Sequence, residues 1–167
     1  EKEAIKKVVS GLKEVIKNYT GSCQLLIEIS AGAGMVIGDT FEEIAEIIKK
    51  IETTKTKNML GVCFDTAHAF ASGYDLRDAK TVTKIFNDFD KIIGLSRLKL
   101  IHANDSQAEF NSKKDRHAHI GFGKIGQAGF AAIVSNKKLK NIDLILETPT
   151  DAGTVKDIKL LKKLRDK

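Results

Sequence analysis

The chain has no tryptophan, one proline and only two cysteines among its 167 residues. Cys23 and Cys63 are too few for a disulfide scaffold, and their spacing matches no zinc-finger pattern. Both fall in or beside expected strands, which favours reduced, buried thiols and an intracellular, cytoplasmic protein. No apolar run approaches the ~18 residues that cross a bilayer, and no stretch has the pattern of a secretory signal, so we expect no membrane partner.

The composition is that of an ordinary globular domain, with 42% hydrophobic residues and a net charge of +6. The positive excess favours a polyanionic partner such as nucleic acid, although lysines on solvated helix faces give the same count. No Pro/Gly/Ser linker or low-complexity tract divides the sequence, so we expect a single domain.

Apolar residues recur every three or four positions from Ala4 to Ile16, which predicts a helix. Four short apolar runs predict buried strands, at 24–29, 60–64, 98–101 and 142–146. Helical patterns follow these runs, at 40–51, 79–93, 127–134 and from about 154 to 164. Capping-box spacing starts the first of these at Thr40, and Thr154 is positioned to cap the last. Residues 104–126 form a long polar segment of the kind that is usually functional.

This order is one helix followed by four strand–helix units, which predicts an α/β fold with a parallel sheet. The spacing of the units, 37 to 45 residues, is typical of a (β/α) barrel. Four strands are half of such a barrel and cannot close it alone.

Each of the four expected strands stops at a residue that can bind a metal: Glu28, Asp65, His102 and Glu147. The carboxyl ends of parallel strands lie on one face of an α/β fold, so these side chains should converge there. Three carboxylates and one imidazole at a common rim predict a metal site.

Three further candidates are His68, three residues after Asp65, and the pair Asp115 and His117 in the long polar segment. An Asp-x-His pair in an extended segment places both side chains on one side of the backbone. Taken singly, these residues have plain structural explanations, such as Asp65 capping a helix that carries His68. His119 continues the alternation and is interpreted as a loop histidine. Oxygen and imidazole donors without thiolates suit zinc, and manganese or iron also accept them.

At these residues the sequence resembles the endonuclease IV family of apurinic/apyrimidinic (AP) endonucleases, also called AP endonuclease family 2. The motifs that carry the resemblance are Leu26-Ile27-Glu28, Gly61 to Asp75, His102-Ala103-Asn104-Asp105-Ser106, Asp115-Arg116-His117, Ile120 to Gly123, and Leu146-Glu147-Thr148-Pro149. The resemblance runs the whole length of the chain, and the motif around Asp65 is its most specific part.

The resemblance implies a fold: a TIM (β/α)8 barrel of the xylose isomerase-like superfamily. Residues 1–167 would be its C-terminal half, four βα units comprising strands 5–8 and helices 4–8, with the N-terminal half absent. The exposed strand edges would then be covered by that missing half or by self-association.

The resemblance also implies an activity, cleavage of the phosphodiester 5′ to an abasic site in double-stranded DNA by a metal-activated hydroxide. Glu28 would bridge two zinc ions, and Asp65, His102 and Glu147 would complete the ligation of one of them. His68, Asp115 and His117 would hold a third zinc ion. Glu28 and Glu147 are the expected catalytic residues. Two histidine ligands of the remaining ion belong to the absent half in this family, so we expect the fragment to be weak or inactive alone.

Two other hypotheses account for the same residues. A xylose isomerase-like sugar isomerase or epimerase also gathers Glu, Asp and His at strand ends around a divalent ion. A non-catalytic half-barrel that binds DNA would instead show salt-sensitive duplex binding without bound zinc.

Overall fold

The structure is a computed structural model that describes residues 2–53, 59–149 and 152–166. Its elements in chain order are α1 (Lys2–Lys17), β1 (Leu25–Glu28), α2 (Phe41–Ile51), β2 (Leu60–Asp65), α3 (Thr66–Ser72), α4 (Ala79–Ile92), the 3-10 turn η1 (Leu95–Arg97), β3 (Leu98–His102), β4 (Asp105–Ser106), β5 (His117–Ala118), α5 (Gly126–Val134), the 3-10 turn η2 (Lys137–Leu139), β6 (Asp143–Ile145) and α6 (Gly153–Arg165). Over these ranges, no helix has both the length and the apolar character that crossing a bilayer requires.

A four-stranded parallel sheet in the order β1-β2-β3-β6 forms the centre of the fold. Its register sets Glu28 opposite Cys63, Asp65 opposite His102, and His102 opposite Ile145. The strand directions and the predicted α/β class are therefore confirmed, and the carboxyl ends of all four strands lie at one edge.

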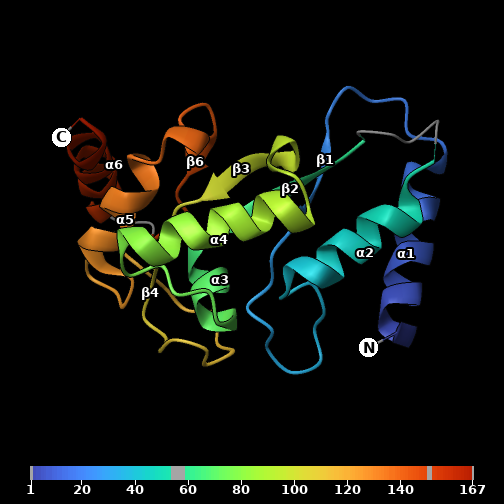
Figure 1. The fold of residues 1–167 in the computed structure, drawn as a ribbon, viewed down its shortest axis with the longest axis horizontal. Coiled ribbons are helices and arrows are strands. Elements are labelled where there is room, and N and C mark those ends of the chain that lie inside the picture. Colours follow the sequence, from blue (N-terminus) through green and yellow to red (C-terminus); the bar gives the residue numbers. More distant parts are fainter. Residues whose placement is uncertain (1, 54–58, 150–151, 167) are drawn as a thin grey trace.

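One face of this sheet is covered by α1, α2, α4, α5 and α6, which contact one another in chain order and run from α1 on the right of Figure 1 to α6 on the left. On the two central strands, residues that point into this layer are fully buried, among them Val62, Phe64 and Ile101. Phe64 packs against Phe41 of α2 and Phe86 of α4. Burying such large apolar side chains is the main favourable contribution to folding.

The opposite face of the sheet is more open. Gly61 lies on it between Leu26 and Lys99, where an added Cβ would come within 2.6 Å of Leu26 Cδ2 and 2.7 Å of Lys99 Cγ. Ile145, on the outer strand β6, is 49% exposed. Each of the outer strands β1 and β6 pairs with one neighbour in this sheet, so both edges keep backbone groups available for a further strand.

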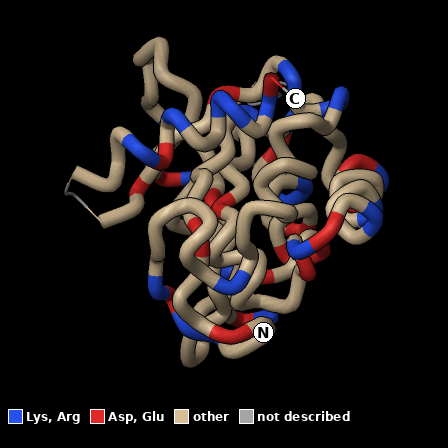
Figure 2. The backbone as a smooth tube through the Cα atoms, turned by 90° about the vertical axis from the view of Figure 1, so that its left-hand side faces the viewer, with Lys and Arg blue, Asp and Glu red and all other residues tan. Residues whose placement is uncertain are grey.

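Charged residues are distributed along the whole chain. In the view of Figure 2, segments with Lys and Arg and segments with Asp and Glu both occur along many parts of the backbone.

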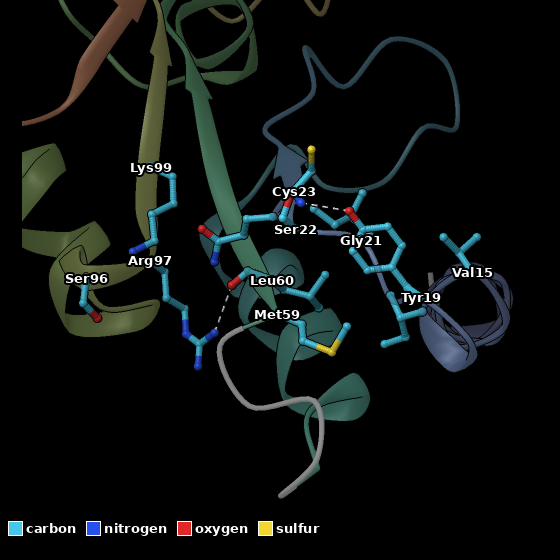
Figure 3. Close-up of a pocket in the computed structure, with 13 residues that line it drawn as sticks. Val15, Tyr19, Gly21, Ser22, Cys23, Met59, Leu60, Ser96, Arg97 and Lys99 are labelled. Atoms are coloured by element: carbon cyan, nitrogen blue, oxygen red, sulfur yellow. Dashed lines mark hydrogen bonds between the residues drawn. The ribbon is translucent and has the colours of Figure 1, made fainter.

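A cavity of about 720 Å³ lies at the amino ends of β1, β2 and β3, beside α1 (Figure 3). Hydrogen bonds join residues of its lining: Cys23 N donates to Tyr19 Oη at 3.0 Å, and Arg97 Nη1 donates to the Leu60 carbonyl at 3.3 Å. None of the described residues that line it is acidic. This cavity is therefore a different feature from the acid-rich strand ends that the sequence singled out.

The helix cap offered as an explanation for Asp65 is present, because the residues after it form the helix α3. Two other local predictions were incomplete or wrong. The long polar segment contains the antiparallel pair β4–β5, which was not predicted. Thr154 lies inside α6, where its hydroxyl donates to the Pro149 carbonyl, so it does not cap that helix. The predicted cap at Thr40 is confirmed, because its hydroxyl accepts a hydrogen bond from Glu43 N at 3.2 Å.

The loop between β5 and α5 is organised by one buried carboxylate. Asp105 is fully buried and accepts backbone N–H bonds from Gly121, Gly123 and Ile125 at 2.9 to 3.0 Å. An added Cβ at Gly123 would lie 2.5 Å from Asp105 Oδ1, so glycine is required there. Charge-assisted bonds to several amides hold this loop close to the end of β3.

We expect Asp105→Asn to lower the free energy of unfolding by about 1–3 kcal/mol, because the new amide would leave buried N–H groups without an acceptor. Urea denaturation checks this, with Asp88→Asn on α4, whose side chain is 33% exposed, as the control. Equal stability of the two variants would contradict the role given to Asp105.

Candidate metal centre

The four strand-end residues meet at the end of the sheet where the strands have their carboxyl ends. Glu28, Asp65, His102 and Glu147 each offer a ligand atom, and these atoms lie within 4.8 Å of one another. The Nδ1 atom of His102 is 3.1 Å from Glu28 Oε1 and 3.0 Å from Glu147 Oε2. It is also 3.8 Å from Asp65 Oδ2. One imidazole nitrogen thus faces three carboxylates, which come from β1, from β2 and from the segment just after β6.

A second group adjoins the first and shares Asp65 with it. Asp65, His68 and His117 also bring ligand atoms within 4.8 Å of one another. The carboxylate of Asp115 spans the two rings, with Oδ2 at 3.2 Å from His68 Nε2 and Oδ1 at 3.2 Å from His117 Nε2. The seven predicted side chains therefore lie together.

Both histidines of the second group have a defined orientation. His68 Nδ1 lies 3.0 Å from the Ile29 carbonyl, and His117 Nδ1 lies 3.1 Å from the Glu147 carbonyl. A carbonyl only accepts, so each Nδ1 carries a proton and each neutral ring keeps a lone pair on Nε2. Both Nε2 atoms are buried and lack a hydrogen bond of acceptable geometry, although Asp115 oxygens are near. A cation between these atoms would accept the lone pairs of both Nε2 atoms. The residues present therefore fit a bound metal ion.

Asp65 serves both groups, and it is also a helix cap. It is fully buried, and its Oδ1 accepts from His68 N at 2.8 Å at the start of α3. Its Oδ2 is the atom that faces His102 and His117. The two explanations that the sequence left open, a helix cap and a ligand, are thus compatible because they use different oxygens.

The electrostatics of the metal-free cluster reflect its excess of acids. Hydrogen bonding to His68 lowers the pKa of Glu28 against the opposing effect of burial, with help from the charges on His102 and His68. Burial alone would lower the pKa of His68, but Glu28, Asp65 and Asp115 together raise it to about 9. Burial raises the pKa of Asp65 in spite of the neighbouring histidines. Protonated His68 therefore supplies positive charge that a bound cation would otherwise provide.

Cys63 lies close to the first group and is not among the predicted ligands. Its sulfur is within 4.8 Å of ligand atoms of Glu28 and His102. Burial, reinforced by the nearby Glu28, raises the pKa of this thiol to about 12. A thiol that stays protonated is a poor ligand, so the prediction of a buried, reduced cysteine agrees with the environment of Cys63. The prediction of burial was wrong for Cys23, which is exposed because it lies in the loop before β1.

His119 is a member of neither group and lies in the loop after β5. Its Nδ1 lies 2.7 Å from Oδ2 of Asp157, a buried acid of α6. Asp157 also accepts from Ile120 N at 3.0 Å and from the Thr148 hydroxyl at 2.8 Å. One carboxylate of α6 therefore fixes both the segment after His117 and the residue after Glu147.

Asn104 is a residue of the site that the sequence did not mark individually. It is fully buried and hydrogen-bonds to both Asp65 and Glu147. Its position two residues after His102 was the only available signal, because the bonds depend on tertiary packing.

The chain belongs to the xylose isomerase-like TIM barrel family, whose model matches residues 1–164. Within it, the chain is 45% identical over 161 residues to a "Probable endonuclease 4" of Halothermothrix orenii, which covers 96% of this chain and 57% of the relative. It is 42% identical over 149 residues to an "Apurinic-apyrimidinic endonuclease" of Caenorhabditis elegans, covering 89% of this chain and 37% of the relative.

The crystal structure of endonuclease IV from Thermus thermophilus has the same fold, with a TM-score of 0.84 at 30% identity over 97% of this chain and 58% of that chain. The predicted fold class and the resemblance to the endonuclease IV family are thereby confirmed. The chain spans about half the length of the relatives that it matches.

The raised pKa of His68 predicts a pH-dependent stability of the metal-free chain. The folded-state pKa of about 9 lies above the ordinary value of 6.5. The stabilisation from protonated His68 is therefore fully present below the ordinary value and is lost as the pH rises through the folded-state value. In chelator, the free energy of unfolding of the wild type should fall across this interval, and that of His68→Gln should fall less. Parallel pH profiles for the two proteins would contradict the assignment.

Proposed function

We propose that this chain is the metal-binding half of a zinc-dependent endonuclease that hydrolyses the phosphodiester 5′ to abasic sites in duplex DNA. The observation that carries the proposal is the pair of buried His68 and His117 Nε2 atoms near Asp115, beside the first group of three acids and one imidazole. Relatives named as endonuclease 4 and as an AP endonuclease supply the reaction and the substrate class.

The two groups divide the proposed ligands between two neighbouring ions. His68, Asp115 and His117 would hold one ion, and Glu28, Asp65, His102 and Glu147 would hold the other. Imidazole and carboxylate donors without a thiolate fit zinc best, and manganese or iron are the alternatives that the same donors accept. Neighbouring ions of this kind supply polarisation of a phosphate ester and activation of water when they are bound.

The protein groups have distinct parts in this proposal. The side chain of Asp65 is fully buried, whereas the side chains of Glu28 and Glu147 are 37% and 46% exposed. Within the group of Glu28, Asp65, His102 and Glu147, the two glutamates thus form the solvent-facing side, where a phosphate of DNA can approach and an attacking water can give up its proton. We assign these two residues the catalytic role for that reason.

The open face of the sheet supports the proposed place of the chain in a larger barrel. Exposed Ile145 and the single pairing of β1 and β6 leave room for further strands. We propose that residues 1–167 correspond to strands 5–8 and helices 4–8 of an eight-stranded barrel. The rest of the barrel would add two histidine ligands and much of the DNA surface, so this half alone should cut weakly or not at all.

Metal analysis tests the ligand assignment directly. We expect the purified chain to hold about two zinc ions, because two ligand groups have enough protein donors. Asp115→Asn should hold about one, because it weakens only the group that contains His68 and His117. Glu109→Gln, an exposed acid near the same loop that pairs with Lys124, is the matched control and should keep the wild-type content. Zinc near zero in the wild type would contradict the proposal and favour the non-catalytic hypothesis.

A nicking assay tests the reaction. Full-length protein that carries these residues should nick a duplex with a tetrahydrofuran abasic analogue on its 5′ side, and chelation should abolish the nicking. Glu147→Gln should reduce kcat by about 100-fold or more, since it removes both a ligand charge and a proton acceptor. Absence of cutting after zinc is restored would defeat the assignment, and conversion of a ketose in the presence of manganese would favour a sugar isomerase.

A further inference from the structure

Asn104 connects two proposed metal ligands that come from different strands. Its Nδ2 donates to Asp65 Oδ2 at 2.7 Å and to Glu147 Oε2 at 3.3 Å. Its Oδ1 accepts from Glu147 N at 2.7 Å. The side chain is fully buried, so these bonds do not compete with bulk water.

The backbone of Asn104 is itself held in place. Asn104 N donates to the Thr66 hydroxyl at 2.9 Å, and that hydroxyl donates to the Asn104 carbonyl at 2.6 Å. Thr66 is fully buried and begins α3, directly after Asp65. The amide of Asn104 is therefore fixed relative to β2 before any ligand binds.

The hydrogen-bond partners decide both the orientation and the chemical type of this side chain. The oxygen must face Glu147 N, and the NH2 group must face the two carboxylates. The reverse orientation would place the amide oxygen against two carboxylates and the NH2 group against a backbone N–H. An aspartate would place a third carboxylate against Asp65 and Glu147. An amide is the group that donates to two acids while accepting from a backbone N–H.

We propose that Asn104 is a positioning residue of the metal centre, which orients Asp65 and Glu147 so that their remaining lone pairs face one cation. It is not a ligand, because the atom that faces the acids is a donor. The inference rests on the proposed function insofar as that function places a metal at Glu28, Asp65, His102 and Glu147. Partners that orient metal ligands in this way typically affect metal affinity by about 10–100-fold.

The test is a zinc competition titration of Asn104→Ala against a chromogenic chelator, with the exposed Asn141→Asp as the control. We expect the affinity of one of the two ions to fall by about 10–100-fold in Asn104→Ala, while the other ion stays within about threefold of the wild type. The control should match the wild type for both ions. Urea unfolding with and without zinc should show a smaller stabilisation by zinc in the variant, which a merely structural role would not produce.

The outcomes separate the two claims. Two tightly bound ions in Asn104→Ala would overturn the positioning role and leave the proposed function standing. No bound zinc in the wild type would overturn both. If Asn104→Ala does not fold, Asn104→Ser replaces it, because serine keeps a small polar group but cannot reach both acids, and the same loss of affinity is expected.

Discussion

Parallel pairing of β1, β2, β3 and β6 is the interaction on which the rest of the structure depends. It turns four positions that are far apart in sequence into neighbours, because every strand ends at the same edge of the sheet. The register then decides which side chains face one another, and it brings Asp65 level with His102. A slip of one residue would move a ligand to the helix-covered face and disperse the group.

Gathering acids in this way creates repulsion that the chain offsets locally. A backbone N–H at the start of α3 donates to one oxygen of Asp65, and the amide of Asn104 donates to the other and to Glu147. Carbonyls of Ile29 and Glu147 fix the rings of His68 and His117. These contacts come from backbone and neutral side chains, so they pre-organise the acids without cancelling the negative charge that attracts a cation.

The sequence was sufficient to predict the features that follow from local pattern and strand direction. Glu28, Asp65, His102 and Glu147 could be placed because each follows an apolar run, and parallel strands share an end. The position of Asp115 and His117 rested on motif resemblance, since their segment has no periodicity that predicts where a loop folds. The helix α3 has almost no polar face, so residues Thr66–Ser72 carry no amphipathic signal.

Other features depend on contacts between distant residues, which no local pattern encodes. Thr154 has the spacing of a cap, but α6 begins one residue earlier, at Gly153. The partners of Asn104 and of Asp105 lie up to 43 residues away along the chain. Composition and spacing identify such residues as polar and near a strand end, and only the folded chain shows what they bind.

Asp157 accepts three hydrogen bonds, and through them the last helix supports the metal centre although it contributes no ligand. Through His119 and Thr148, α6 is fastened to the chain immediately beyond His117 and immediately beyond Glu147. One helix thus holds two ligand-bearing segments in position. A nonsense or frameshift change in the codons for α6 would spare every cation-binding side chain and yet release two of them from their positions.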